Sequence, residues 1–146
     1  MNVYMDQTQP KTIFIVEDDV TYADILESVL IKAGFVVKVF HNPTNLLNTI
    51  KSAKPDLVIL DIMLPQISGF TILEELKRDP TTKDICVFCL TNLPEEVGKD
   101  KALALNAYCY LTKAHYNASQ ILEQIKYYFS ESKGTPPPPA PGNTTS

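Results

Sequence analysis

Leu57-Val58-Ile59-Leu60-Asp61 is an uninterrupted apolar run that ends in a carboxylate. Such a run is typical of a strand that is buried on both faces, as in the middle of a parallel sheet. Three more apolar runs end in polar residues, and these are Ile13–Val16 before Glu17-Asp18-Asp19, Cys86–Leu90 before Thr91, and Tyr108–Leu111 before Thr112-Lys113. Ligands bind at the carboxyl ends of the strands in an open parallel sheet, so we expect these polar side chains to meet at one edge.

Segments with helical periodicity separate the apolar runs. The expected helices are Val20–Lys32, a segment from Pro43 that ends before Pro55, Ser68–Arg78, Pro94–Leu105 and a segment that begins near Asn117. Residues Phe35–Phe40 are rich in β-branched and aromatic side chains and predict the remaining strand. Because parallel strands need crossover connections, five strands alternating with five helices predict an α/β fold with a doubly wound parallel sheet.

The composition is that of a soluble globular protein. The 146 residues are 45% hydrophobic and 21% charged, and the net charge is −4. A negative balance argues against nucleic-acid binding, which depends on neutralising phosphates, and no apolar stretch is long enough to cross a membrane. The N-terminus lacks the residue order of a signal peptide, so we expect a cytoplasmic protein.

Cys86, Cys89 and Cys109 fall in predicted strands and are expected to be buried thiols, with Cys86 and Cys89 on opposite faces of the sheet.

Three segments are expected along the chain. Residues 1–10 are polar and predict a flexible N-terminus, and residues 133–146 are rich in proline and predict a disordered tail. Residues 11–132 carry all the predicted strands and helices, so they are expected to form one domain.

Glu17, Asp18 and Asp61 are expected to stand close together at the sheet edge. Clustered carboxylates repel one another, so they need a cation to stay ionised together. Mg²⁺ suits such a site, because it is a hard ion that takes oxygen ligands. The Lys113 ammonium and the Thr91 hydroxyl suit the oxygens of a phosphoryl group, which an aspartate can accept as a nucleophile.

The same residues carry a resemblance to a known family. They are the acidic pair Glu17-Asp18, the segment Asp61-Ile-Met-Leu-Pro-x-x-Ser-Gly, and then Thr91, Tyr110 and Lys113. With these residues in this order, the chain from Thr12 to Ser132 resembles the receiver domain of two-component response regulators. The resemblance, to a single-domain receiver like the chemotaxis regulators, implies a flavodoxin-like fold with strand order 2-1-3-4-5.

The resemblance also implies a role for each site residue. Asp61 is the phosphorylation site and accepts a phosphoryl group from a histidine kinase or a histidine phosphotransfer protein, with Thr91 and Lys113 as its catalytic partners. Mg²⁺ is bound directly by Asp18 and Asp61, through water by Glu17, and by the backbone carbonyl of Met63.

The effect of phosphorylation is expected to reach a partner-binding surface through two switch residues, Thr91 and Tyr110. The phosphoryl group should draw the Thr91 hydroxyl inward, and the Tyr110 ring should enter the vacated space. The face formed by the fourth helix, the last strand and the last helix should then bind a downstream protein or a second copy of the chain. The intrinsic chemistry is limited to self-phosphorylation and self-dephosphorylation, so the resemblance implies a signalling switch and not a turnover enzyme.

Two departures from the family pattern bear on the site. Asn92 replaces the small residue that usually follows the switch threonine, and Ala114 follows Lys113 where the family usually has a proline with a cis peptide bond. A non-proline cis bond costs about 2.5–4 kcal/mol, so the sequence leaves both isomers of the Lys113–Ala114 bond open.

Two alternative functions are weighed against this interpretation. A Mg²⁺-dependent phosphohydrolase with an aspartyl nucleophile commonly has a second carboxylate two residues later, where this chain has Met63. A receiver that binds partners without phosphorylation is disfavoured, because Asp18, Asp61, Thr91 and Lys113 are all present.

Overall fold

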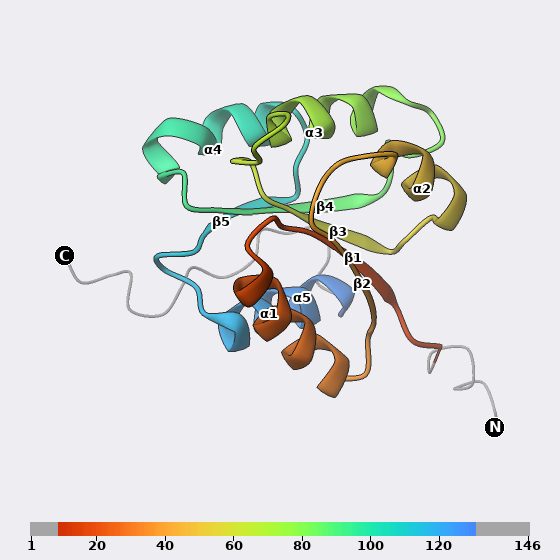
Figure 1. The fold of residues 1–146 in the computed structure, drawn as a ribbon, viewed down its shortest axis with the longest axis vertical. Helices are drawn as coiled ribbons and strands as arrows, with labels where there is room; N and C mark the ends of the chain where they lie inside the picture. The colour runs from red at the N-terminus through yellow and green to blue at the C-terminus, as the bar shows by residue number, and fades with distance from the viewer. Residues whose placement is uncertain (1–8, 131–146) are drawn as a thin grey trace.

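A five-stranded parallel sheet organises residues 9–130, which are the residues that the computed structural model describes (Figure 1). The strands are β1 (Thr12–Val16), β2 (Val36–Phe40), β3 (Leu57–Leu60), β4 (Cys86–Thr91) and β5 (Cys109–Thr112), and the helices are α1 (Val20–Lys32), α2 (Leu46–Ala53), α3 (Gly69–Arg78), α4 (Glu95–Ala104) and α5 (Ala118–Phe129). The strand order β2-β1-β3-β4-β5 confirms the predicted flavodoxin-like fold. The predicted Pro-rich tail, and nearly all of the predicted flexible N-terminus, lie outside the described residues.

Helices cover both faces of the sheet. Figure 1 shows α1 and α5 on one face and α2, α3 and α4 on the other. Ile59 of β3 and Phe88 of β4 are level with each other and pack in the apolar layer under α1 and α5, whereas Val58 and Val87 pack in the opposite layer. Burying a side chain of this size stabilises the fold by about 1.5–3 kcal/mol. All of β3 is buried, as its apolar run predicts.

The three cysteines are structural. Cys86 and Cys109 lie in the layer under α1 and α5, whereas Cys89 lies in the other layer, so Cys86 and Cys89 point to opposite faces as predicted. All three are buried, and none of them forms a disulfide within residues 9–130. Burial raises the pKa of the Cys89 thiol to about 12, which excludes the reactive thiolate that a redox pair needs.

Local sequence sets the ends of α1 and α5. Helix α1 has the predicted bounds, and the Asp19 carboxylate caps it by accepting a hydrogen bond from the Tyr22 N–H at 3.1 Å. Helix α5 follows a capping box in which Asn117 and Gln120 bond to each other's backbone, as its sequence predicts.

The start of α2 differs from the prediction. The helix begins at Leu46, so the prediction that it opens at Pro43 is wrong. Asn45 has a left-handed backbone with φ of 57°, which interrupts a right-handed helix. The Asn42 side chain accepts a hydrogen bond from the Thr44 N–H at 3.0 Å and so stabilises a turn in this segment.

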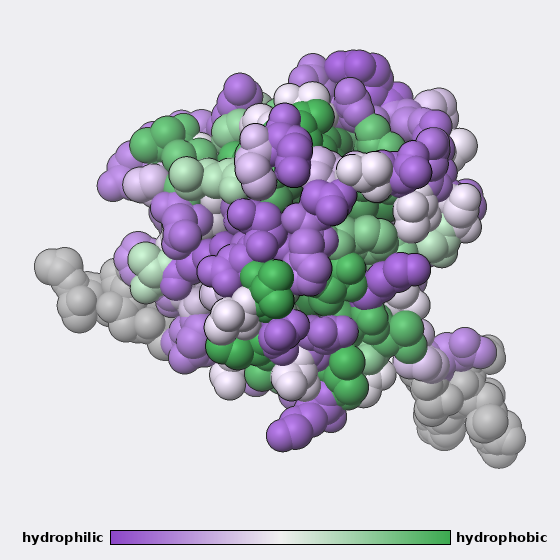
Figure 2. All heavy atoms as spheres, viewed as in Figure 1, coloured by the Kyte–Doolittle hydropathy of each residue, from purple (hydrophilic) through white to green (hydrophobic). Residues whose placement is uncertain are grey.

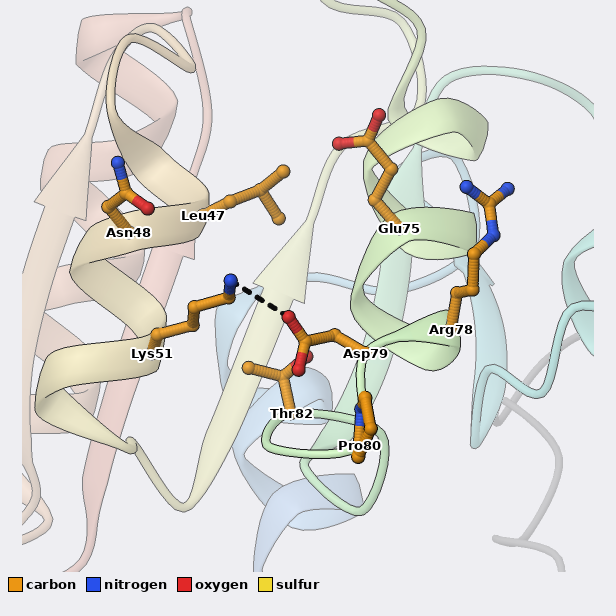
Figure 3. Close-up of a pocket in the computed structure, with 8 residues that line it drawn as sticks. All are labelled: Leu47, Asn48, Lys51, Glu75, Arg78, Asp79, Pro80 and Thr82. Carbon is orange, nitrogen blue, oxygen red and sulfur yellow. Dashed lines mark ion pairs between the residues drawn. The ribbon is translucent and has the colours of Figure 1, made fainter.

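A groove separates α2 from α3 (Figure 3). Its volume is about 390 Å³, and the Lys51 ammonium reaches across it to the Asp79 carboxylate at 2.9 Å. The Asp79 carboxylate also accepts hydrogen bonds from the Thr81 backbone and hydroxyl. The bond from Lys51 is the main reason that the pKa of Asp79 falls to about 2. Because α3 ends at the amino edge of the sheet, this groove lies away from the edge where the predicted site residues stand.

Hydrophilic and hydrophobic side chains are unevenly distributed on the face that Figure 2 shows. Figure 2 shows hydrophilic side chains over most of the viewed face, with separate hydrophobic groups that include one over α4 at the upper left. Val97 and Leu103 of α4 are among the exposed large hydrophobic residues, at 65% and 40% exposure. Within residues 9–130, no helix combines the length and the apolar character needed to span a bilayer.

Candidate functional site

Strand pairing brings the predicted site residues to one edge of the sheet. Val16 at the end of β1 is level with Leu60 at the end of β3. The Asp61 N–H donates to the Val16 carbonyl at 3.1 Å, and the Lys113 N–H donates to the Thr91 carbonyl at 2.9 Å. The backbone of Asp61 and that of Lys113 are therefore fixed by the sheet's own hydrogen-bond ladder.

Lys113 makes the central ion pairs of the site. Its Nζ lies 2.7 Å from Glu17 Oε1 and 3.2 Å from Asp61 Oδ2, and none of the three side chains is more than 9% exposed. Water therefore screens these charges weakly. Every peptide bond among residues 9–130 is trans, including the bond from Lys113 to Ala114. The ammonium thus reaches the cluster without the cis bond that is usual in the family.

Backbone N–H groups hold the remaining oxygens of the two buried carboxylates. The Met63 N–H donates to Asp61 Oδ1 at 2.9 Å, and the Asp19 N–H donates to Glu17 Oε2 at 3.1 Å. Each carboxylate is therefore bonded to the backbone through one oxygen and to Lys113 through the other. Charge-assisted bonds of this kind are short and directional, so they fix the orientation of both groups.

The cluster carries an excess of negative charge. Burial raises the pKa of Glu17, the hydrogen bond from Lys113 opposes this rise, and the charge of Asp61 adds to it. Burial also acts to lower the pKa of Lys113, but the hydrogen bond to Glu17 and the charges of Asp61 and Glu17 outweigh burial and raise that pKa above its ordinary value. Lys113 is therefore protonated at neutral pH. With Asp18 included, the group has three carboxylates, and the Lys113 ammonium is ion-paired with two of them.

The three carboxylates can hold a metal ion together. Glu17, Asp18 and Asp61 each offer an oxygen, and these oxygens lie within 4.8 Å of one another. Glu17 and Asp61 are buried, whereas Asp18 is exposed and leaves the group open to solvent. A set of carboxylate oxygens suits a hard dication such as Mg²⁺. Asp19 is engaged in capping α1 and is not part of this group.

The two predicted switch residues bond to the same residue, Leu93. Thr91 Oγ1 accepts a hydrogen bond from the Leu93 N–H at 3.2 Å, and the Tyr110 hydroxyl donates to the Leu93 carbonyl at 2.8 Å. The Tyr110 ring is buried in this structure, at 4% exposure. Gly98 of α4 leaves room for the buried Tyr110 side chain, because a Cβ atom at this position would overlap the Tyr110 hydroxyl.

Three residues of the site region were not singled out from the sequence. Leu93 acts through its backbone, which no side-chain pattern reveals. Gly98 could have been flagged, because glycine is unfavourable inside a helix and so suggests a close approach. Tyr22 of α1 lies with its ring centroid 4.4 Å from Lys113 Nζ, a contact between residues far apart in the chain that no local pattern indicates.

Comparison with known sequences identifies a match over most of the chain. The family of the response regulator receiver domain matches residues 13–126. The phosphate regulon transcriptional regulatory protein PhoB of Pseudomonas aeruginosa is 34% identical over 116 residues, which cover 80% of this chain and 50% of PhoB. The chain therefore spans about half the length of this curated relative.

Comparison with solved structures gives the same result. The signal receiver domain of a DNA-binding response regulator from Colwellia psychrerythraea matches with a TM-score of 0.76 and 28% identity, over 83% of this chain and 99% of that one. The phosphorylated cyanobacterial phytochrome response regulator RcpA matches with a TM-score of 0.75 and 26% identity, over 90% of this chain and 100% of that one. The sequence comparison and the structure comparison thus both match this chain to response regulators.

We expect Mg²⁺ to stabilise the protein and the substitution Asp18→Ala to remove most of that gain. A ligand that binds the folded state at ten times its Kd adds about 1.4 kcal/mol of stability. Thermal unfolding with and without Mg²⁺ measures the effect. Asp84→Ala removes an exposed carboxylate at the opposite edge of the sheet and should leave the gain intact. Equal stabilisation of Asp18→Ala and the wild type would contradict the metal site.

Proposed function

The chain belongs to the family of response regulator receiver domains, and on that premise we propose that it is a phosphorylation-activated switch of a two-component pathway. Asp61 is the residue that accepts the phosphoryl group, from a histidine kinase or a histidine phosphotransfer protein. The observation that carries this proposal is the buried Asp61 carboxylate, paired with Lys113 and grouped with two further carboxylates. Residues 11–132 form the domain that carries this function, and the proposed setting is the cytoplasm.

Phosphoryl transfer to Asp61 is a displacement at phosphorus. A carboxylate oxygen of Asp61 supplies the electron pair for the new O–P bond, while the donor's P–N bond breaks and its imidazole nitrogen keeps the electron pair and takes up a proton. The Lys113 ammonium and the Thr91 hydroxyl bind the oxygens of the transferred group. Because such reactions depend on positioning and charge neutralisation, these two groups suffice as the catalytic partners in the protein.

Mg²⁺ is the cofactor of this proposal. Asp18 and Asp61 would hold it directly and Glu17 through water, together with the carbonyl of Met63, whose N–H is bonded to Asp61. When bound, the ion neutralises the negative charge that the phosphoryl group brings to an already anionic site. Support comes from the donor set, which consists of oxygens.

Leu93 connects the phosphorylation site to a binding surface. When the Thr91 hydroxyl turns to the phosphoryl group, it gives up its bond from the Leu93 N–H, and the segment that bonds Tyr110 is free to move. When the Leu93 segment moves, the surface formed by α4, β5 and α5 changes shape. In this changed form the surface binds a downstream protein or a second copy of the chain. Exposed Val97 and Leu103 supply apolar contact area on α4. The net charge of −4 makes a protein a better partner than a nucleic acid.

Acetyl phosphate with Mg²⁺ tests the acceptor directly. Intact-mass measurement should show the gain of one phosphoryl group on the wild type, and Asp61→Asn should abolish it. Asp56→Asn is the matched control, because Asp56 stands at the other end of β3 and accepts a hydrogen bond from the Thr12 N–H, which an asparagine can also accept. An unlabelled wild type, or a labelled Asp61→Asn, would refute the proposed function.

We expect Gly98→Ala to push the Tyr110 ring out of its buried position, because the added methyl group overlaps the Tyr110 hydroxyl. ¹⁹F NMR of fluorotyrosine-labelled protein measures this, with the Tyr110 signal identified by its loss in Tyr110→Phe. The signal should move toward that of an exposed tyrosine. Lys99→Ala, an exposed change on the same helix, should leave it in place. If the Tyr110 signal also stayed in place in Gly98→Ala, the inference that the missing side chain of Gly98 allows Tyr110 to be buried would be wrong.

A further inference from the structure

Lys113 is held from a third side by an aromatic ring. We propose that Tyr22 is a positioning residue, and that the face of its ring keeps the Lys113 ammonium between the carboxylates of Glu17 and Asp61. The inference rests on the proposed function, because it is Asp61 phosphorylation that a well-placed ammonium assists.

The contacts of Lys113 Nζ leave it little freedom. Glu17 Oε1 and Asp61 Oδ2 lie at 2.7 and 3.2 Å, and the centroid of the Tyr22 ring lies at 4.4 Å. An ammonium within about 6 Å of a ring centroid is attracted to the negative face of the ring, most strongly where water is excluded. The Lys113 side chain is 9% exposed. The ring therefore takes the place of water on the side of the ammonium that the carboxylates do not reach.

The backbone that carries the ring is itself fixed. Tyr22 lies in the first turn of α1, where its N–H donates to the capping carboxylate of Asp19. Asp19 in turn donates its N–H to Glu17. These two bonds fix the backbone of Tyr22 relative to the Asp19 cap and the Glu17 carboxylate, and the buried position of the Tyr22 hydroxyl limits rotation of the ring.

The ring of Tyr22, and not its hydroxyl, acts on Lys113. The hydroxyl oxygen is buried and has no hydrogen-bond partner among residues 9–130. Burial, with the charges of Glu17 and Asp61, raises the Tyr22 pKa to about 12, so the phenol is neutral at neutral pH. A buried hydroxyl without a partner is unfavourable for folding. Tyr22→Phe therefore keeps the ring and removes a polar group that contributes no bond.

Without the ring, the Lys113 ammonium loses one of its three restraints and keeps only the two carboxylates. Lysine has a flexible four-carbon stem, so an ammonium that is not enclosed adopts several positions. Fewer molecules then present it toward a phosphoryl group at Asp61, and the labelling rate falls. The effect on the rate requires Lys113, because the ring acts through the ammonium alone.

Rates of labelling by acetyl phosphate with Mg²⁺ test this dependence. Tyr22→Leu should slow labelling about tenfold, whereas Tyr22→Phe should label at the wild-type rate. In a Lys113→Met background, Tyr22→Leu should cause no further loss, because contacting residues that act as a unit are not additive. A tenfold loss that persists in the Lys113→Met background would show that Tyr22 acts elsewhere and would overturn the proposal.

NMR of Lys113 provides a readout that needs no phosphorylation. The ring current of Tyr22 should shift the ε-methylene protons of Lys113 upfield in the wild type and in Tyr22→Phe, and Tyr22→Leu should lose the shift. Ordinary lysine shifts in the wild type, or a wild-type labelling rate in Tyr22→Leu, would overturn the proposal. An upfield shift in a wild type that acetyl phosphate fails to label would support the positioning of Lys113 and refute the phosphoacceptor function.

Discussion

The Lys113 ammonium, placed between the carboxylates of Glu17 and Asp61, is the interaction on which the rest of the site depends. Asp18 adds a third carboxylate to the group, so the ammonium neutralises only part of the charge. An arrangement of this kind is unfavourable by itself, because like charges that are partly buried repel one another. The proposed Mg²⁺ site follows from the same imbalance, because a dication would neutralise the excess charge. Charge repulsion at the sheet edge and the proposed metal binding are therefore two consequences of one arrangement.

The sheet supplies the rigidity that this arrangement needs. Two apolar layers hold the strands, and the backbone of Asp61 is bonded directly to β1. The proposed signalling output needs the opposite property, which is a segment that can rearrange. Leu93 lies just after β4 and bonds to both Thr91 and Tyr110. A change in the bonding of one hydroxyl can therefore reach the surface of α4 and β5, while the strands stay in place.

Much of the fold and of the charged cluster could be predicted from the sequence. Apolar runs such as Leu57–Leu60 predict buried strands, and parallel strands oblige the polar residues that follow them to meet at one edge. What could not be predicted depends on contacts between residues far apart in the chain. The contact of the Tyr22 ring with Lys113 and that of the Tyr110 hydroxyl with Gly98 do not affect the local pattern of apolar residues, so that pattern cannot predict them. The late start of α2 follows from the left-handed backbone of Asn45, which propensity alone does not specify.

The most direct test of this account is the free energy of unfolding in urea of the wild type and of Asp61→Asn, each with and without Mg²⁺. Removing one of three clustered negative charges should make Asp61→Asn more stable than the wild type by about 1 kcal/mol when Mg²⁺ is absent. The wild type should then gain more from Mg²⁺ than the variant does. A less stable Asp61→Asn without Mg²⁺, together with an equal gain from Mg²⁺ in both proteins, would contradict the claim that charge repulsion at this edge creates the metal site.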